Sequence, residues 1–188
     1  CILNNYLDKM NIKKFALAAL ALGTTAYIVN NNKKHIKYKP AQNFNLSEFL
    51  GRWYEIARLE NKAQKGQTNV TYRFNLNEDK GTLDILVRGY DKRKKSWSKI
   101  DGIGTQEIEN VGKFKTTFLP SFAKQLFVID FDKDYNNVLV ASEDYKMLWI
   151  LSRKKEISDK VKLRFSESAQ KVGFDPNRLI WPSQIPIA

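Results

Sequence analysis

The sequence predicts a mainly β protein, an eight-stranded antiparallel up-and-down β-barrel with one C-terminal α-helix packed on its outside. Three observations lead to this fold class. Runs of alternating polar and apolar residues, rich in aromatic and β-branched side chains, recur at short intervals between residues 52 and 153. There are eight such runs, the number of strands that closes around side chains or one small ligand. An apolar stripe at helical spacing follows them near the C-terminus.

The first strand sets the requirement for a closed sheet. It is expected to leave a tight turn at Gly51 and to carry Trp53 and Tyr54. Because successive side chains of a strand point to opposite faces, the odd-numbered residues of 53–59 should share one face and the even-numbered ones the other. Trp53 and Tyr54 are both large and face opposite ways, so this strand needs cover on both sides. A sheet closed on itself, with another element packed outside, provides that cover.

The remaining elements follow from the same alternation and from turn-forming residues. Leu46–Leu50 is expected to form a short helical turn before the first strand, and Glu60–Gly66 is the longest polar connection near the presumed open end. The expected strands are short and regularly spaced, at residues 52–59, 67–76, 82–91, 96–106, 113–119, 125–132, 136–143 and 146–153.

The C-terminal helix is indicated by its caps and by its apolar stripe. Ser158 is a favourable N-cap residue, and Asp159 suits the positive end of the helix dipole. Gly173 occupies the position at which glycine commonly ends a helix. A short strand at Leu179–Trp181 is expected before Pro182. The apolar residues that recur at helical spacing, and that should face the barrel, are Val161, Phe165, Ala169 and Val172.

Composition limits the classes of function. Lys and Arg exceed Asp and Glu by 32 to 20, a net charge of +12. A basic surface permits attraction to anionic partners, although a simple solvated surface is an equal alternative. The lysines are scattered and not striped along one helix, so no nucleic-acid partner is expected. Cys1 is the only cysteine and His35 the only histidine. No internal disulfide, His-based metal site or catalytic triad is therefore expected in the barrel, and we expect no cofactor, no metal and no enzymatic activity.

The N-terminal part has the layout of an export segment. Lys13 and Lys14 precede the apolar run Phe15–Val29, which is short for a membrane-spanning helix of about 20 residues. Two alternatives stay open, a secretory signal cleaved near Thr24–Ala26 and an uncleaved membrane anchor. We therefore divide the chain into an N-terminal signal or anchor segment at residues 1–32, a polar linker at 33–44 and a barrel domain at 45–184.

Several short motifs resemble those of the lipocalin family, in particular the bacterial outer-membrane lipocalins and their apolipoprotein D relatives. They begin with Gly51-x-Trp53-Tyr54, and the resemblance covers roughly residues 43–184. Further blocks follow in the family's order, ending at Leu148–Arg153. The residues that we assign to this structural signature are Gly51, Trp53, Tyr54, Asp132, Tyr135, Asp144, Tyr145 and Arg153.

The resemblance implies both a fold and a function. It implies a calyx-shaped barrel that carries or stores a hydrophobic small molecule, a fatty acid or a lysophospholipid, in the bacterial cell envelope (periplasm or outer membrane). It implies that the helical turn before Gly51 closes one end and that Glu60–Gly66 is a lid at the other. Bacterial relatives are often lipidated on a cysteine just after the signal. No cysteine follows the apolar run here, so this implication of the resemblance fails, and Cys1 would be a lipidation site only with a signal upstream of it. Lipidation of Cys1, cleavage of the segment and formation of a homodimer stay open.

The candidate ligand site is the barrel interior. Strand parity places a set of largely apolar, partly aromatic side chains inside, and the alternative is that they fill a solid core. The resemblance favours a cavity. It also implies that Leu119–Phe122, in the loop before the sixth strand, borders the mouth. The residues expected to line it are Tyr72, Phe74, Ile85, Val87, Thr116, Phe118, Met147 and Trp149.

Other polar residues are expected to have structural roles. The resemblance implies that Arg153 lies against Trp53 at the closed end, and an indole face attracts a cation. Glu55 should point inward, where a bare charge is costly and needs an arginine, a bound water or a raised pKa to compensate. Contact with a polar ligand head is the alternative to this structural role. Three aspartates suggest a calcium loop, but the required glycine and final glutamate are missing. We expect them to cap turns at the closed end of the barrel, and they are Asp132, Asp134 and Asp144.

The sequence thus predicts a lipid-binding barrel protein with two alternatives. One alternative is a lipid-modifying enzyme of the same fold. The other is an envelope interaction module whose barrel is filled. The expected partners are a hydrophobic small molecule and, through the N-terminus, a membrane.

Overall fold

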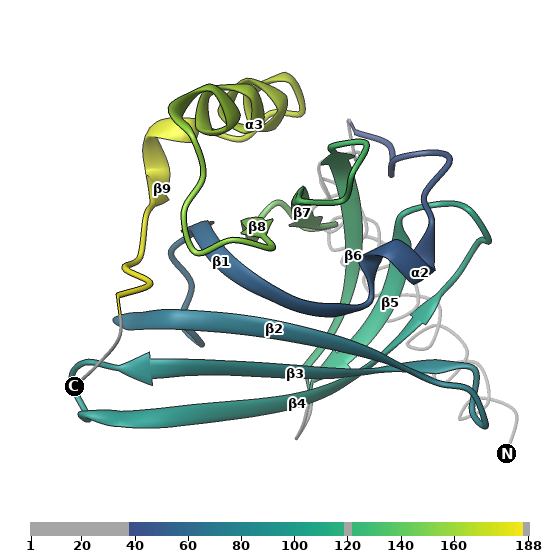
Figure 1. Cartoon of the computed structure of the whole chain (residues 1–188), viewed down its shortest axis with the longest axis horizontal. Coiled ribbons are helices and arrows are strands. Elements are labelled where there is room, and N and C mark those ends of the chain that lie inside the picture. The colour runs from purple at the N-terminus through teal and green to yellow at the C-terminus, as the bar shows by residue number, and fades with distance from the viewer. Residues whose placement is uncertain (1–37, 119–121, 186–188) are drawn as a thin grey trace, which may run out of the picture. The chain divides into compact units, whose positions relative to one another are not determined.

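Eight antiparallel strands follow one another around the barrel in chain order (Figure 1). The computed structural model describes residues 38–118 and 122–185. The sheet closes because β1 pairs with β8 on one side and with β2 on the other. This confirms the expected fold class. The strands are β1 (Gly51–Leu59), β2 (Gln67–Asn77), β3 (Thr82–Asp91), β4 (Ser96–Gln106), β5 (Lys113–Phe118), β6 (Phe122–Phe131), β7 (Asn137–Ser142) and β8 (Leu148–Ser152).

A β-bulge interrupts the alternation of the first strand. Glu55 is paired with Leu151 and Ala57 with Ile150, so Ile56 is an extra residue on β1. An extra residue reverses the inward and outward alternation beyond it. Arg58 consequently shares the inner face with Glu55, whereas Ala57 and Leu59 join the outer hydrophobic cluster. The expectation of one unbroken alternation over 53–59 is therefore wrong beyond Glu55.

The closed end is sealed by the short helix α2 (Leu46–Phe49). The side chain of Asn45 accepts a hydrogen bond from the backbone N–H of Ser47 and caps this helix. Phe49 is buried in the inner cluster, and its carbonyl accepts a hydrogen bond from the indole of Trp53 at 2.8 Å. Gly51 follows with φ +93°, a backbone conformation that side-chain-bearing residues rarely adopt. The turn before the first strand thus requires glycine.

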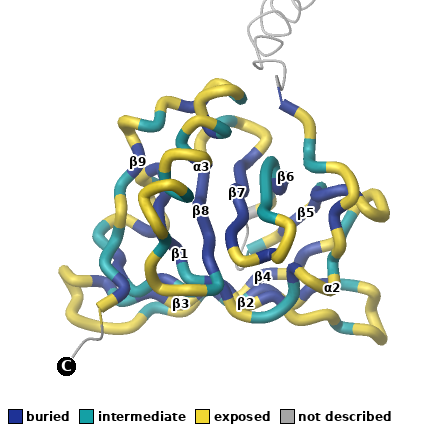
Figure 2. Tube along the Cα trace, turned by 45° about the horizontal axis from the view of Figure 1, so that its top comes forward, coloured by how far each residue is buried: buried dark blue, intermediate teal, exposed yellow. Residues whose placement is uncertain are grey.

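Helix α3 (Asp159–Lys171) covers the outside of the barrel. Ser158 caps it, as expected, by accepting from the backbone N–H of Val161. Phe165 and Ala169 are fully buried against outward-facing strand residues such as Ile56. All residues of β7 and β8 are buried, because one face of these strands lines the barrel interior and the other lies under α3 and its neighbours (Figure 2).

The C-terminal segment runs along β1 where β1 and β2 separate. The two strands pair only over Gly51–Tyr54 of β1. Beyond that point η1 (Pro176–Arg178) leads to β9 (Leu179–Ile180), which pairs with Arg58 and Leu59. The buried side-chain amide of Gln184 then donates to the carbonyls of Glu55, at 2.8 Å, and Val70, at 3.0 Å. Gln184 therefore bridges the seam between β1 and β2.

Part of the expected linker is packed on the barrel. Tyr38 and Phe44 are buried, and the Tyr38 hydroxyl donates to the carbonyl of Ser142. The export segment at 1–32 lies outside the described residues, as do Cys1 and His35. The division of the chain at residues 32 and 44 stays a prediction. Within residues 38–118 and 122–185, no helix has the length and apolar character needed to cross a bilayer.

Candidate functional site

The barrel encloses a cavity with a volume of about 830 Å³. Its walls are mainly apolar side chains from the strands, and its mouth is formed by the loop after β1 and the turn between β7 and β8. The lining residues are Glu60, Asn61, Lys62, Ala63, Gln64, Tyr72, Phe74, Ile85, Val87, Ile100, Phe118, Lys124, Leu126, Val140, Lys146, Met147, Trp149 and Leu151.

The structure brings together most of the residues that the sequence placed in the cavity. Seven of those eight line the wall, and Thr116 does not. Thr116 is buried and its hydroxyl donates to the carbonyl of Lys124 at 2.9 Å. The ligand contact of the other seven stays a prediction, and they are Tyr72, Phe74, Ile85, Val87, Phe118, Met147 and Trp149. Of the expected border at Leu119–Phe122, residues 119–121 lie outside the described residues, and Phe122 begins β6.

Two inward-facing glycines leave room for large side chains. A Cβ atom on Gly102 would lie 2.7 Å from Cδ1 of Phe118, its cross-strand neighbour. A Cβ atom on Gly104 would lie 3.2 Å from Cδ1 of Ile85. Glycine at these positions therefore lets the aromatic and aliphatic groups of the wall pack against the backbone of β4.

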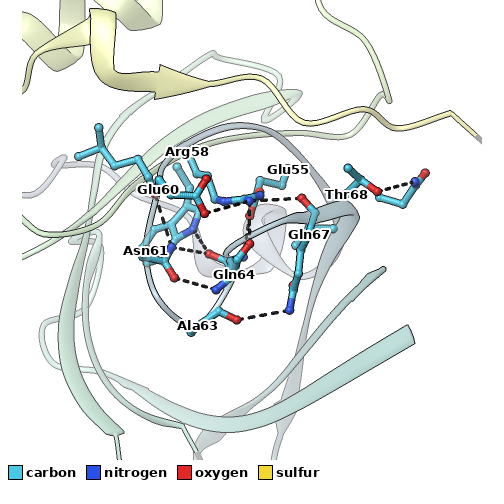
Figure 3. Close-up of polar contacts among 12 residues, drawn as sticks. Glu55, Arg58, Glu60, Asn61, Ala63, Gln64, Gln67 and Thr68 are labelled. Carbon is cyan, nitrogen blue, oxygen red and sulfur yellow. Dashed lines mark hydrogen bonds and ion pairs between the residues drawn. The ribbon is translucent and has the colours of Figure 1, made fainter. Parts of the chain in front are cut away.

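A polar cluster interrupts the apolar wall below the mouth (Figure 3). The Glu55 carboxylate is fully buried and accepts from Arg58 at 2.5 Å, from Gln64 at 2.8 Å and from the Tyr72 hydroxyl at 3.0 Å. Arg58 is the partner that the inward position of Glu55 required. The bulge in β1 brings it to the same face. Only its Nε has no hydrogen-bond partner among the described residues.

Burial dominates the acid–base properties of this cluster. Removal from water disfavours the charged carboxylate and raises the pKa of Glu55, and the nearby Arg58 charge and hydrogen bonds only partly oppose this. Burial, followed by the Glu55 charge, also raises the pKa of Tyr72 well above its ordinary value. The Tyr72 hydroxyl therefore stays protonated and acts as a hydrogen-bond donor.

The loop at residues 60–66 is fastened to the wall by Gln64. The side-chain oxygen of Gln64 accepts from Asn61 at 2.8 Å and from the Trp149 indole at 3.0 Å. Its backbone carbonyl accepts from Arg58 at 2.7 Å. The sequence did not single out Gln64, because side chains in loops have no periodicity that tells inward from outward. The loop closes over part of the mouth and is held by side-chain hydrogen bonds.

Three lysines stand at the rim of the mouth, namely Lys62, Lys124 and Lys146. Asp144 forms ion pairs with Lys124 and, at 3.9 Å, with Lys146. Burial opposes ionisation of Asp144, but hydrogen bonds from Lys124 and Ser142 hold its pKa below the ordinary value. Asp144 was expected at the closed end, and this is wrong. Turns alternate between the two ends of an up-and-down barrel, so the turn after β7 shares the open end with the loop after β1.

The other signature residues lie away from the cavity. Asp132 caps the turn after β6 at the closed end by accepting from the backbone N–H groups of Asn136 and Asn137. Asp134 is exposed in the same turn. The Tyr135 hydroxyl accepts from the backbone N–H of Asn45 at 2.6 Å. Tyr54 and Tyr145 pack in the outer cluster. In the part of the chain that the structure describes, no group of three or more His, Cys, Asp or Glu residues could hold a metal.

The fold and the cavity together define a class of protein, a closed barrel that can enclose a small apolar molecule through one open end. The chain belongs to the lipocalin-like domain family, whose sequence profile matches residues 44–184. This confirms the resemblance drawn from the signature motifs.

Relatives support the family assignment. Outer membrane lipoprotein Blc of Escherichia coli (strain K12) is 34% identical over 143 residues, which cover 76% of this chain and 80% of that protein. The Vibrio cholerae protein of the same name is 32% identical over 148 residues, which cover 78% of this chain and 86% of that protein. Among solved structures, insecticyanin from Manduca sexta matches with a TM-score of 0.63 at 18% identity, covering 78% of this chain and 84% of that one. The likeness to insecticyanin shows the fold alone.

Proposed function

We propose that the protein binds, and carries or stores, a single-chain amphiphilic lipid in the barrel cavity. The observation that carries this proposal is the combination of an apolar cavity of about 830 Å³ with lysines at its rim. Burying an apolar chain there is favourable by about 25 cal/mol per Å² of surface removed from water. The volume lies within the roughly 300–1,000 Å³ of typical small-molecule sites.

The polar groups of the wall favour a ligand whose buried part is purely apolar. Glu55, Gln64 and Tyr72 hydrogen-bond to one another, and the Trp149 indole donates to Gln64. A polar ligand group placed beside them would lose water without gaining a free partner, which is costly. The head of the ligand therefore belongs at the rim, where Lys62 forms no ion pair with any described residue. A carboxylate or phosphate head fits this charge, so we propose a fatty acid or a lysophospholipid.

The relatives favour a place in the cell envelope. Those from Escherichia coli and Vibrio cholerae are named as outer membrane lipoproteins. We propose by analogy that this chain is exported to the periplasm or outer membrane, with residues 1–32 as signal or membrane anchor. Treatment of cells with a signal-peptidase inhibitor, followed by mass measurement of the envelope-bound protein, separates cleavage from retention.

Binding without turnover is the role that the lining chemistry supports. None of the described residues that line the cavity is a serine, cysteine or histidine, the usual nucleophiles and bases of lipid-modifying enzymes. The buried Glu55 is committed to three donors. If the protein were an enzyme, incubation with lipid would yield chemically altered lipid. If it were an interaction module with no ligand, no lipid would be recovered bound to it.

The test is displacement of a fluorescent fatty acid, with a matched pair of variants on β4. Ile100 lines the cavity, whereas Ile103 lies on the same strand and is 46% exposed. We expect Ile100→Trp to fill the cavity and weaken binding at least tenfold, and Ile103→Trp to leave it unchanged. Equal binding by both variants would place the lipid elsewhere. Mass spectrometry of lipid extracted from protein purified from its native envelope identifies the ligand, and chemically altered products would indicate an enzyme.

A further inference from the structure

A second hollow lies on the outer surface of the barrel, over β1 to β4. It has a volume of about 410 Å³, and its lining carries three arginines but no carboxylate. We call it the basic groove. Its lining residues are Arg52, Asn69, Thr71, Tyr72, Arg73, Leu86, Arg88 and Trp97.

Strand register gathers the three guanidinium groups on one face. Arg52 is paired with Arg73 across β1 and β2, and Thr71 is paired with Arg88 across β2 and β3. Directly paired residues point to the same side of a sheet. All three arginines are exposed on this outer side, and the Arg88 guanidinium lies 5.5 Å from the ring centroid of Trp97.

The charge of the groove is not balanced within the described chain. Arg52, Arg73 and Arg88 form no ion pair with any described residue. Two aspartates share this outer side. Asp101, paired in register with Leu86, forms an ion pair with Lys99 at 3.0 Å, and Asp84, two residues from Leu86 on β3, forms no ion pair with any of the three arginines. Three neighbouring cations without counterions create a positive potential that favours an anionic partner.

The basic groove continues toward the open end of the barrel. Trp97 lies two residues beyond the turn at 92–95, whose Lys92, Lys94 and Lys95 side chains are exposed. This turn follows β3, so it lies at the same end as the cavity mouth. Trp97 is itself 52% exposed. An exposed tryptophan beside cations is typical of a protein surface that lies in the headgroup region of a bilayer.

We propose that the basic groove and the adjoining turn dock on an anionic lipid bilayer. The guanidinium groups bind lipid phosphates, which match their planar donor geometry, and Trp97 lies among the headgroups. Because the turn shares the open end, docking there places the cavity mouth next to the membrane. This contact is separate from the N-terminal segment and does not depend on which molecule the cavity holds. A bilayer fits better than a soluble anion, because the cations extend from the groove to the turn.

The first test measures binding of the full chain to vesicles by flotation. We compare vesicles of phosphatidylcholine with vesicles that also contain phosphatidylglycerol. The groove variant R52Q/R73Q/R88Q removes three charges, and the control K154Q/K160Q/K171Q removes three exposed charges beside and on α3. Each cation near an anionic surface contributes about fivefold in affinity, so the groove variant should bind about a hundredfold more weakly. Equal losses in the two variants would overturn the proposal, because only net charge would then matter.

The second test reports which tryptophan contacts the bilayer. It remains informative even if the N-terminal segment keeps every variant bound to the vesicles. Lipids brominated near the headgroup quench tryptophans that touch the bilayer. Trp53 and Trp149 are buried, which leaves Trp97 and Trp181 as exposed tryptophans. We expect W97F to remove most of the quenching that anionic vesicles produce, and W181F to retain it. Quenching that survives in W97F would overturn the proposal. The proposal would also be overturned if the groove arginines were needed to bind free glycerol phosphate or an acidic protein while the protein did not bind vesicles.

Discussion

The guanidinium group of Arg153 lies over the indole ring of Trp53, with its central carbon 3.6 Å from the ring centroid. The same guanidinium donates to the carbonyls of Arg52, Glu48 and Leu50 at 2.6 to 2.8 Å. These carbonyls belong to α2, to the turn after it and to the start of β1. One side chain therefore holds together the three segments that close the barrel, and Trp53 provides the surface on which it rests.

Replacing Arg153 by methionine should destabilise the barrel without affecting the cavity. The change removes a cation–π contact worth roughly 0.5–2 kcal/mol and charge-assisted hydrogen bonds, each worth about 1.5–3 kcal/mol when both partners are buried. Because Arg153 is partly exposed, we expect a total loss of about 2–3 kcal/mol in urea unfolding. Lys154→Met, at the exposed neighbouring position, is the control. A loss below about 0.5 kcal/mol for Arg153→Met would show that α2 and β1 hold the closed end unaided.

The loop at the mouth should control how fast a bound lipid leaves. Gln64→Ala removes the side-chain bonds to Glu55, Tyr72 and Trp149. Since opening the loop must break these bonds, we expect the dissociation rate of a fluorescent fatty acid to rise about tenfold, which corresponds to about 1.4 kcal/mol. Stopped-flow displacement measures this rate. Lys65→Ala, an exposed position in the same loop, should leave it unchanged. Equal rates in wild type and Gln64→Ala would mean that the ligand leaves without opening the loop.

The buried Glu55 should make stability fall as the pH rises. Its pKa is raised in the folded protein above the ordinary value of 4.5, so the folded state holds the proton more tightly than the unfolded chain. The resulting stabilisation is fully present below about pH 4.5 and is lost as the pH rises through the folded pKa. Urea unfolding of wild type and Glu55→Gln between pH 4 and pH 8 isolates this effect. The difference between their unfolding free energies should decline toward higher pH. A constant difference would mean that Arg58 offsets the cost of burial completely.

The strands could be predicted from the sequence because alternation and turn chemistry agree along most of the chain. The boundaries of β3 and β4 coincide with those expected, and β6 begins only three residues early. The inward-facing residues of β2 and β3 were predicted from the same alternation. β7 was different. All six of its residues are buried, so no alternation marked Val140 as a wall residue.

The polar part of the site could not be predicted in the same way. The bulge at Ile56 leaves no trace in the sequence, because Ile56 and Ala57 are both apolar and either could face the core. Unbroken alternation would point Arg58 outward and leave Glu55 without a partner. The inward position of Gln64 depends on how the loop folds back onto the barrel, and the pattern of side chains in the sequence does not encode this. The position of Asp144, in contrast, follows from counting turns, and that signal was available in the sequence.

The seam between β1 and β2 should depend on Gln184. Its amide donates to the carbonyls of Glu55 and Val70, where these strands no longer pair with each other. Gln184→Ala would leave both buried carbonyls without this donor, at a cost of about 1–3 kcal/mol. Gln170→Ala, at an exposed position on α3, should change the unfolding free energy by less than about 0.5 kcal/mol. Hydrogen exchange adds a local readout, because loss of the bridge should speed exchange of the Asn69 amide, which donates to Ser183 at 2.8 Å. Unchanged exchange at Asn69 together with unchanged stability would show that β9 alone holds the C-terminal segment on the barrel.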